Sequence, residues 1–294
     1  MIVSASRRTD IPAFYSEWFM NRIRAGVCLV PNPFNPTRVS RVSLEPEDVD
    51  VIVFWTRNPR PLFPRLSELD ARGYRYYFLV TLLANPRQID PGSPPFDAAV
   101  RTFRELSGRI GPERVVWRYD PVFLTSISDP FFHVETYRRI AGALKGYTKR
   151  SIVSVMHPYR KIRKRITELT GRGVDLLPDD EGALSSLMAA LAEISSENEM
   201  EIFSCADELD LQRYGIRPGK CVDDELISRV FGLDVEGAKD ACQRKSCRCA
   251  PSKDVGMYDS CLSGCVYCYA VTSFDRARAN HRRHDPTSES LLSS

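Results

Sequence analysis

The stretch VIVFWTRN, residues 51–58, is an apolar run of strand length that ends in three polar residues. A nearly continuous apolar run, in contrast to an alternating one, is typical of a parallel strand covered on both faces. Runs of the same kind recur at 2–6, 76–80, 115–118, 152–156 and 201–205. Helix-like segments separate them, from 10 to 26 and near 62–72, 96–108, 132–145, 182–197 and 223–232. This alternation predicts an α/β fold with parallel strands joined by right-handed crossovers.

The other segments indicate how the chain is organised. We expect residues 1–240 to form the strand–helix repeats, and residues 241–294 to be a cysteine-rich segment packed on the same domain. Residues 27–44 are predicted to form a hairpin over one end of the sheet. The proline-rich stretch NPRQIDPGSPP (85–95) is predicted to be a loop and not a domain linker, because the α/β pattern resumes after it.

Polar, ionisable or ligating residues follow each predicted strand. The carboxyl ends of parallel strands build the active sites of barrels and open α/β sheets, so we expect a functional mouth there. An arginine at this mouth could hold a carboxylate in two parallel hydrogen bonds. The alternative is that Arg118 pairs with Asp120, or Arg8 with Asp10, and ties strand ends together. The predicted catalytic residues are Arg8, Asp10, Arg57, Arg118 and Asp120, and further mouth residues are Arg7, Thr56, Thr81 and His157.

Composition excludes several classes of protein. With 43% hydrophobic and 27% charged residues among 294, the chain is predicted to be an ordinary globular protein. It has neither a signal-peptide pattern nor an apolar run of about 18 residues, so we expect a cytoplasmic location and no membrane span. A net charge of +3 gives little support to nucleic-acid binding. The basic run at 160–165 could meet phosphates or be a solvated helix face.

Nine cysteines are present, seven of them between 221 and 268. In a reducing compartment such clustering favours metal ligation over disulfides. The sequence CLSGCVYCYA (261–270) places three thiols at the spacing C-x3-C-x2-C. Thiolates of Cys261, Cys265 and Cys268 could hold three irons of a [4Fe-4S] cluster and leave the fourth open to an external ligand. The alternative is a zinc site completed by a fourth thiolate.

Four more cysteines could form a second site. Cys205 ends a predicted strand, Cys221 follows a glycine-containing turn, and Cys247 and Cys249 form a C-x-C pair. We predict that these four converge on a second [4Fe-4S] cluster or on zinc. Cys205 and Cys221 could instead be buried apolar residues, and Cys242 is a spare candidate ligand.

The cysteine motif, with Tyr267 before its last cysteine, resembles the radical S-adenosylmethionine (SAM) signature. The resemblance implies a [4Fe-4S] cluster, bound SAM, an electron donor such as flavodoxin or ferredoxin, and a 5′-deoxyadenosyl radical. It also implies a partial (β/α)6 TIM-like barrel in which the motif follows the first strand. Here the motif comes last, so we expect a circular permutation, with residues 254–259 forming that strand beside the first one.

The stretches SASRRTDIPAFYSEWF, VIVFWTRNP, WRYDP and SKDVGMYDSCLSGCVYCYA resemble the bacterial family of domain of unknown function 1848. The resemblance covers residues 1 to about 286 and implies a C-terminal cysteine cluster similar to that of radical SAM proteins, with no established substrate. WRYDP and FWTRNP also resemble motifs of spore photoproduct lyase-like proteins. The predicted function is therefore a radical SAM-like enzyme of unknown substrate. The alternative is a zinc- or cluster-stabilised nucleic-acid-binding module, using 160–165 and 276–283, or a DNA-lesion lyase.

Overall fold

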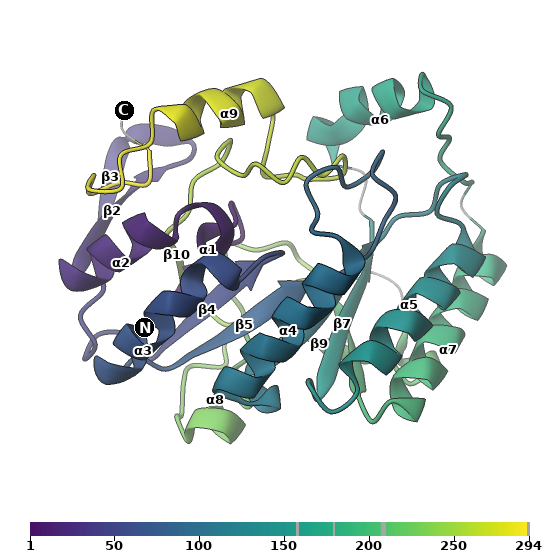
Figure 1. Cartoon of the computed structure of the whole chain (residues 1–294), viewed down its shortest axis with the longest axis horizontal. Coiled ribbons are helices and arrows are strands. Elements are labelled where there is room, and N and C mark those ends of the chain that lie inside the picture. The colour runs from purple at the N-terminus through teal and green to yellow at the C-terminus, as the bar shows by residue number, and fades with distance from the viewer. Residues whose placement is uncertain (157–158, 179, 207–209, 293–294) are drawn as a thin grey trace.

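The chain folds around one parallel sheet with helices on its faces (Figure 1). The computed structural model describes residues 1–156, 159–178, 180–206 and 210–292, so that His157 lies outside the described residues. Every pairing within the eight-stranded sheet is parallel. In sheet order the strands are β10 (Lys253–Asp254), β1 (Ile2–Ala5), β4 (Val51–Thr56), β5 (Tyr76–Thr81), β6 (Val115–Val122), β7 (Arg150–Val155), β8 (Glu201–Cys205) and β9 (Arg217–Gly219).

All six predicted strands are present, which confirms the α/β class. Strand β9 was not predicted, and strand β10 is shorter than the predicted 254–259. The reason is local: the backbone N–H of Gly256 donates to the Asp254 carboxylate at 3.0 Å, and this turn ends the strand after two residues. Within the described residues no pairing joins β9 to β10, so the sheet is open and no closed barrel is found.

Most helices follow the predicted segments, whereas the helices at 163–170 and 274–282 lie outside them. They are α1 (Ile11–Phe14), α2 (Ser16–Arg24), α3 (Leu66–Ala71), α4 (Phe96–Ile110), α5 (Pro130–Leu144), α6 (Arg163–Thr170), α7 (Glu181–Glu197), α8 (Asp224–Phe231) and α9 (Phe274–Arg282). Short 3-10 turns occupy 60–65, 112–114, 160–162 and 212–214. The predicted hairpin at 27–44 is confirmed as the antiparallel pair β2 (Val27–Asn32) and β3 (Asn35–Ser43). No described helix has the length and apolar character needed to cross a bilayer.

Both faces of the sheet are buried, as the unbroken apolar strands predicted. In β4 the side chains of Ile52 and Phe54 join the larger core, whereas Val51 and Val53 join a smaller one on the opposite face. Figure 1 shows α3 and α4 crossing one face, with α6 and α9 along the upper edge. The smaller core is completed by α8 and by residues 247–250, so the cysteine-rich segment contributes directly to the packing of the sheet.

One carboxylate attaches the last strand to the first. Asp254 of β10 accepts hydrogen bonds from the hydroxyls of Ser4 (3.0 Å) and Ser6 (2.7 Å) and from the backbone N–H of Arg7 (2.8 Å). Gly256 lies so close to β1 that a Cβ there would stand 2.0 Å from the Ser6 Oγ. The segment that carries the cysteine motif is therefore fixed at the carboxyl end of β1.

Replacing Gly256 with alanine should destabilise the protein by about 1–3 kcal/mol, because the added methyl group collides with Ser6. The matched control is Gly108→Ala in α4, where a Cβ meets no atom within 4 Å. This control should leave stability unchanged or raise it by about 0.5–1 kcal/mol. Urea denaturation of both variants measures the difference, and equal stabilities would contradict the close approach of the two segments.

A buried histidine gives a pH dependence with a defined sign. Burial lowers the pKa of His133 to about 4, while Tyr119 contacts its Nδ1 at 2.8 Å. The unfolded chain then binds more protons than the folded one between that value and the ordinary 6.5. Stability is complete above the ordinary pKa and should fall by roughly 2–3 kcal/mol as the pH drops to about 4.5.

His133→Gln keeps hydrogen-bonding groups and removes the titration. Between about pH 7.5 and about pH 4.5, the variant should lose roughly 2–3 kcal/mol less unfolding free energy than the wild type. Parallel urea titrations of the two proteins provide the measurement. An identical loss in both would show that His133 does not stay neutral in the fold.

Candidate functional site

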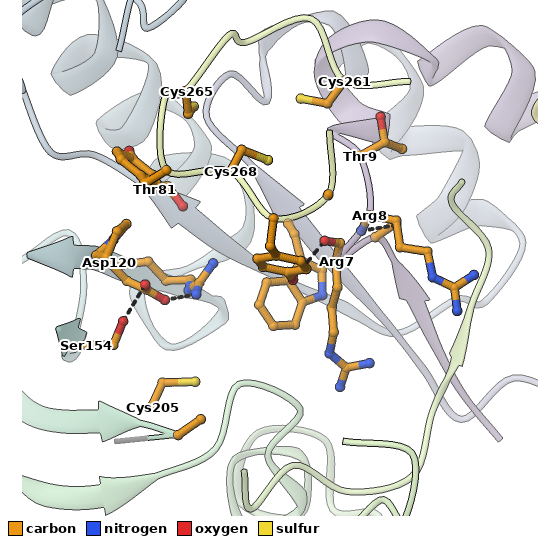
Figure 2. A pocket seen from close by; sticks show the side chains of 18 of the residues that line it. Arg7, Arg8, Thr9, Thr81, Asp120, Ser154, Cys205, Cys261, Cys265 and Cys268 are labelled. Atoms are coloured by element: carbon orange, nitrogen blue, oxygen red, sulfur yellow. Dashed lines mark hydrogen bonds and ion pairs between the residues drawn. The ribbon is translucent and has the colours of Figure 1, made fainter. Parts of the chain in front are cut away.

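A cavity of about 410 Å³ opens at the carboxyl ends of the strands, where the sequence predicted a functional mouth. All five predicted catalytic residues line it. Six of the seven predicted ligand cysteines line it as well, namely Cys205, Cys247, Cys249, Cys261, Cys265 and Cys268. Figure 2 shows Cys261, Cys265 and Cys268 along the upper rim and Cys205 on the opposite side. The cavity therefore brings together side chains from both ends of the chain.

The signature loop, residues 261–268, is docked onto the proline-rich loop 85–95. The backbone N–H of Gly92 donates to the Ser263 carbonyl at 3.0 Å, and that of Val266 donates to the Ile89 carbonyl at 3.0 Å. A Cβ at position 92 would lie 2.4 Å from the Ser263 oxygen, so only glycine permits this approach. Gly264 adopts a left-handed φ of +71°. Backbone contacts thus shape the loop, while the Cys261 thiol donates to the Ser263 hydroxyl of the same loop at 3.5 Å.

A buried ionic group fastens the same loop. The Asp90 side chain is fully buried and lies 3.4 Å from the Arg57 guanidinium. It accepts hydrogen bonds from the Tyr267 hydroxyl (2.7 Å) and from the Asn85 amide (2.8 Å). Arg57 also donates to Tyr267 and, at 2.7 Å, to Ser93. Arg57, predicted as catalytic, is therefore engaged in holding the signature loop.

Arg165 contacts the loop from α6. Its guanidinium donates to the backbone carbonyls of Cys265 (3.4 Å) and Cys268. Arg165 belongs to the basic run that was predicted to be either a phosphate contact or a solvated helix face. It is buried, whereas Arg160, Arg163 and Lys164 are exposed. Arg165 therefore contacts the cysteine loop and not solvent.

Burial governs the protonation of the three signature thiols. It raises the pKa of Cys261 to about 11 and raises the pKa values of Cys265 and Cys268 above the ordinary range. Without a metal these thiols stay protonated at neutral pH. A bound cation would displace their protons, which is how thiol sites couple metal binding to pH.

The other four predicted ligands form a second thiol group. The Cys205 and Cys221 sulfurs are 3.1 Å apart, the Cys249 sulfur accepts the backbone N–H of Cys221 at 3.4 Å, and the Cys249 thiol interacts electrostatically with that of Cys247. Cys242 is exposed and donates its backbone N–H to Asp240 at 2.9 Å, so Cys221 and not Cys242 belongs to this group. As the side chains stand in the described residues, no group of three or more His, Cys, Asp or Glu could hold a metal ion.

Two arginines flank the indole of Trp55 between the thiol groups. The Arg7 and Arg118 guanidinium carbons lie 5.3 and 4.8 Å from its ring centroid. Arg118 pairs with Asp120, as the alternative interpretation predicted, and Asp120 also accepts from Ser154 at 2.5 Å (Figure 2). Buried donors without a partner in the described residues remain at Arg7 Nη2, Arg118 Nε and Trp55 Nε1. These groups make this wall of the cavity cationic.

Asp10 and Arg8 have structural contacts. Asp10 caps α1 by accepting from the Ala13 N–H at 3.0 Å and also accepts from the Arg57 N–H at 2.7 Å. Burial raises its pKa to about 6. Arg8 donates to the Gly256 carbonyl at 3.3 Å and lies over the Tyr258 ring. The predicted pairing of Arg8 with Asp10 is absent from the described contacts.

Sequence reasoning did not identify Asp90, Arg165 or Asp254. Asp90 stands in a loop whose prolines indicated only a turn, and Arg165 was grouped with its exposed neighbours. Asp254 was placed in a strand, without a role. The available signal for Asp90 was the dipeptide Pro91-Gly92 beside an acidic residue, which favours a tight turn but does not reveal what docks on it.

Comparison with protein-family models places most of the chain in one family. The family model described as domain of unknown function (DUF1848) matches residues 2–270, which includes the whole signature loop. A search of curated proteins finds no match.

Asp90→Asn should release the signature loop, since it leaves the buried Arg57 guanidinium without its counter-charge. The expected loss of stability is about 3–5 kcal/mol, with faster amide hydrogen exchange at 261–268. The control is Glu105→Gln, which weakens two surface ion pairs, with Arg60 at 3.1 Å and with Arg109 at 2.8 Å, and should cost less than about 1 kcal/mol. Unchanged exchange in the Asp90 variant would show that this ion pair does not hold the loop.

Proposed function

We propose that this chain, which belongs to the DUF1848 family, is a radical SAM-type enzyme with a circularly permuted partial barrel. In this proposal Cys261, Cys265 and Cys268 hold a [4Fe-4S] cluster, and SAM occupies the adjoining cavity. The substrate is left open. The proposal also requires a one-electron donor such as a flavodoxin or ferredoxin, and a cytoplasmic location, where thiols stay reduced.

One observation carries the proposal: the three signature cysteines line the cavity at the carboxyl ends of the strands. The strand before them, β10, pairs with β1 in parallel, with Ser4 opposite Asp254. If the two chain ends were joined and the chain instead began just before β10, then β10 would be its first strand and the cysteine motif would follow that strand. This supports a permuted order of elements around an unchanged site.

The donor set has the chemistry that such a cluster needs. Soft thiolates are the usual ligands of iron–sulfur clusters, and three of them leave one iron open. The protein supports the loop through Gly92, Asp90 and Arg165, and the hydrogen bond from the Cys261 thiol to Ser263 is internal to the loop. When bound, the reduced cluster supplies the electron that cleaves the sulfonium bond of SAM.

Other side chains supply binding and orientation. Arg7 and Arg8 are the cations proposed to hold the carboxylate of SAM or an anionic substrate, because Arg57 is paired with Asp90 and Arg118 with Asp120. Trp55 and Tyr269 offer aromatic surfaces in the same cavity. A cavity of about 410 Å³ lies within the size range of small-molecule sites, which favours this function over that of a surface module.

No described contact favours the nucleic-acid-binding alternative. Arg165 is turned to the signature loop, and the exposed Arg276 lies 3.3 Å from Asp259, which directly precedes that loop. Two residues of the predicted basic surfaces thus have partners inside the protein. A DNA-lesion lyase remains within the proposed class, since it would use the same cluster.

Replacing Cys261, Cys265 and Cys268 together with alanine should abolish reductive SAM cleavage, because no open-iron cluster can then form. The measurement is 5′-deoxyadenosine formed per chain after anaerobic reconstitution, with dithionite and SAM. We expect a loss of about a hundredfold or more, limited by the assay background.

Cys242→Ala serves as the matched control, since it removes an exposed thiol at the edge of the same cavity that belongs to neither group. It should keep the wild-type yield of 5′-deoxyadenosine. Equal yields from the triple variant and the wild type would overturn the assignment. So would a colourless wild-type protein that takes up no iron under anaerobic reconstitution.

A further inference from the structure

We propose that Cys205, Cys221, Cys247 and Cys249 together bind one zinc ion in a closed tetrahedral site. The inference does not depend on the proposed function, because these thiols come from other segments than the signature loop. The four residues are called the four-thiol group below. The proposal rests on their convergence, the separation of their sulfurs and the positive charge around them.

Three separate segments bring the thiols together. Cys205 ends β8, and Cys221 follows β9, which pairs with β8 through Cys205 opposite Gly219. The C-x-C pair is placed by backbone bonds, with the Ala250 N–H donating to the Val222 carbonyl at 3.0 Å. Sheet pairing and this added backbone contact therefore fix the thiol positions without any contribution from a metal.

The four side chains do not form a metal cage as they stand in the described residues, so binding requires them to move, and the distance that bears on the number of ions is the one between the Cys205 and Cys221 sulfurs. Four thiolates around one zinc, with Zn–S near 2.3 Å, stand about 3.8 Å apart. The Cys205 and Cys221 sulfurs, at 3.1 Å, need to move apart by less than an ångström, as their shared hydrogen bond gives way to metal–sulfur bonds. Cluster thiolates bind different irons and must stand further apart. Among the described residues, no thiol–thiol hydrogen bond joins Cys261, Cys265 and Cys268, in contrast to the four-thiol group.

The surrounding charges match four thiolates. A zinc ion with four thiolates carries a net charge of −2, whereas four thiols are neutral. Arg7 interacts electrostatically with Cys249 and Cys221, and Arg118 with Cys205 and Cys221. Each of these arginines has a buried N–H without a partner among the described residues. Arg118 already has Asp120 as a counter-charge, and Arg7 interacts with Asp254, so an anionic site beside them would add an acceptor for these two N–H groups.

Backbone donors also favour thiolate sulfur. The N–H groups of Cys221 and Val222 both point at the Cys249 sulfur at 3.4 Å. Hydrogen bonds of this kind stabilise the charged form of a ligand and fix its orientation, as outer partners do in metal sites. With four protein ligands the site has no open position, so its role is structural: it holds β8, β9 and the cysteine-rich segment at the lower wall of the cavity.

The test is metal analysis of the full chain purified without chelator. We expect about one zinc per chain in the wild type, and the same zinc content in the triple variant of Cys261, Cys265 and Cys268. The double variant Cys247→Ser/Cys249→Ser should lose the zinc, while Cys242→Ala keeps it. A triple variant that loses its iron but keeps its zinc supports this proposal, and the loss of iron then bears only on the proposed function.

A second measurement avoids variants that fail to fold. Cobalt added to the zinc-depleted wild type should give the d–d bands of a tetrahedral site together with thiolate charge-transfer absorption. Iron and sulfide retained by the triple variant would overturn the proposal in favour of a second cluster. A zinc-free wild type with a Cys205–Cys221 disulfide, or with four alkylatable thiols and no cobalt spectrum, would overturn it as well.

Discussion

The carboxylate of Asp254 connects the two ends of the chain, and the candidate site depends on that connection. It accepts from two serine hydroxyls and two backbone N–H groups, one of them that of Arg7. Because β10 is only two residues long, its ladder hydrogen bonds alone would hold it weakly. Hydrogen bonds to a charged carboxylate are stronger than those between neutral groups. The bonds to the half-buried Asp254 therefore fix the start of the cysteine loop against β1.

From this attachment the loop is built outward by contacts that avoid its thiols. Gly92 admits the backbone of Ser263, the ion pair of Arg57 and Asp90 binds Tyr267, and Arg165 contacts two carbonyls. On the other side of the cavity, the four-thiol group joins three segments. The cationic wall formed by Arg7, Trp55 and Arg118 lies between these two sulfur-rich regions, so it can balance negative charge on either of them.

Much of this architecture follows from local sequence. Unbroken apolar runs predicted six strands with both faces buried, and cysteine spacing predicted which thiols gather at the mouth. Local sequence could not predict contacts between distant segments. Tyr267 and Asp90 are 177 residues apart, and their hydrogen bond depends on how two loops pack against each other. The same holds for Asp10, predicted as catalytic, whose carboxylate caps a helix and holds the Arg57 backbone. The predicted partial barrel is also not confirmed: within the described residues the sheet is open, with the short strands β9 and β10 at its two edges.

The central claim is that the signature loop carries a cluster with an iron open to SAM. Electron paramagnetic resonance of the reconstituted, dithionite-reduced wild-type protein tests it most directly, with spectra recorded before and after SAM is added. The account predicts a reduced four-iron signal whose g values change when SAM binds the open iron. A four-iron signal that SAM leaves unaltered, or the absence of any iron signal, would contradict it.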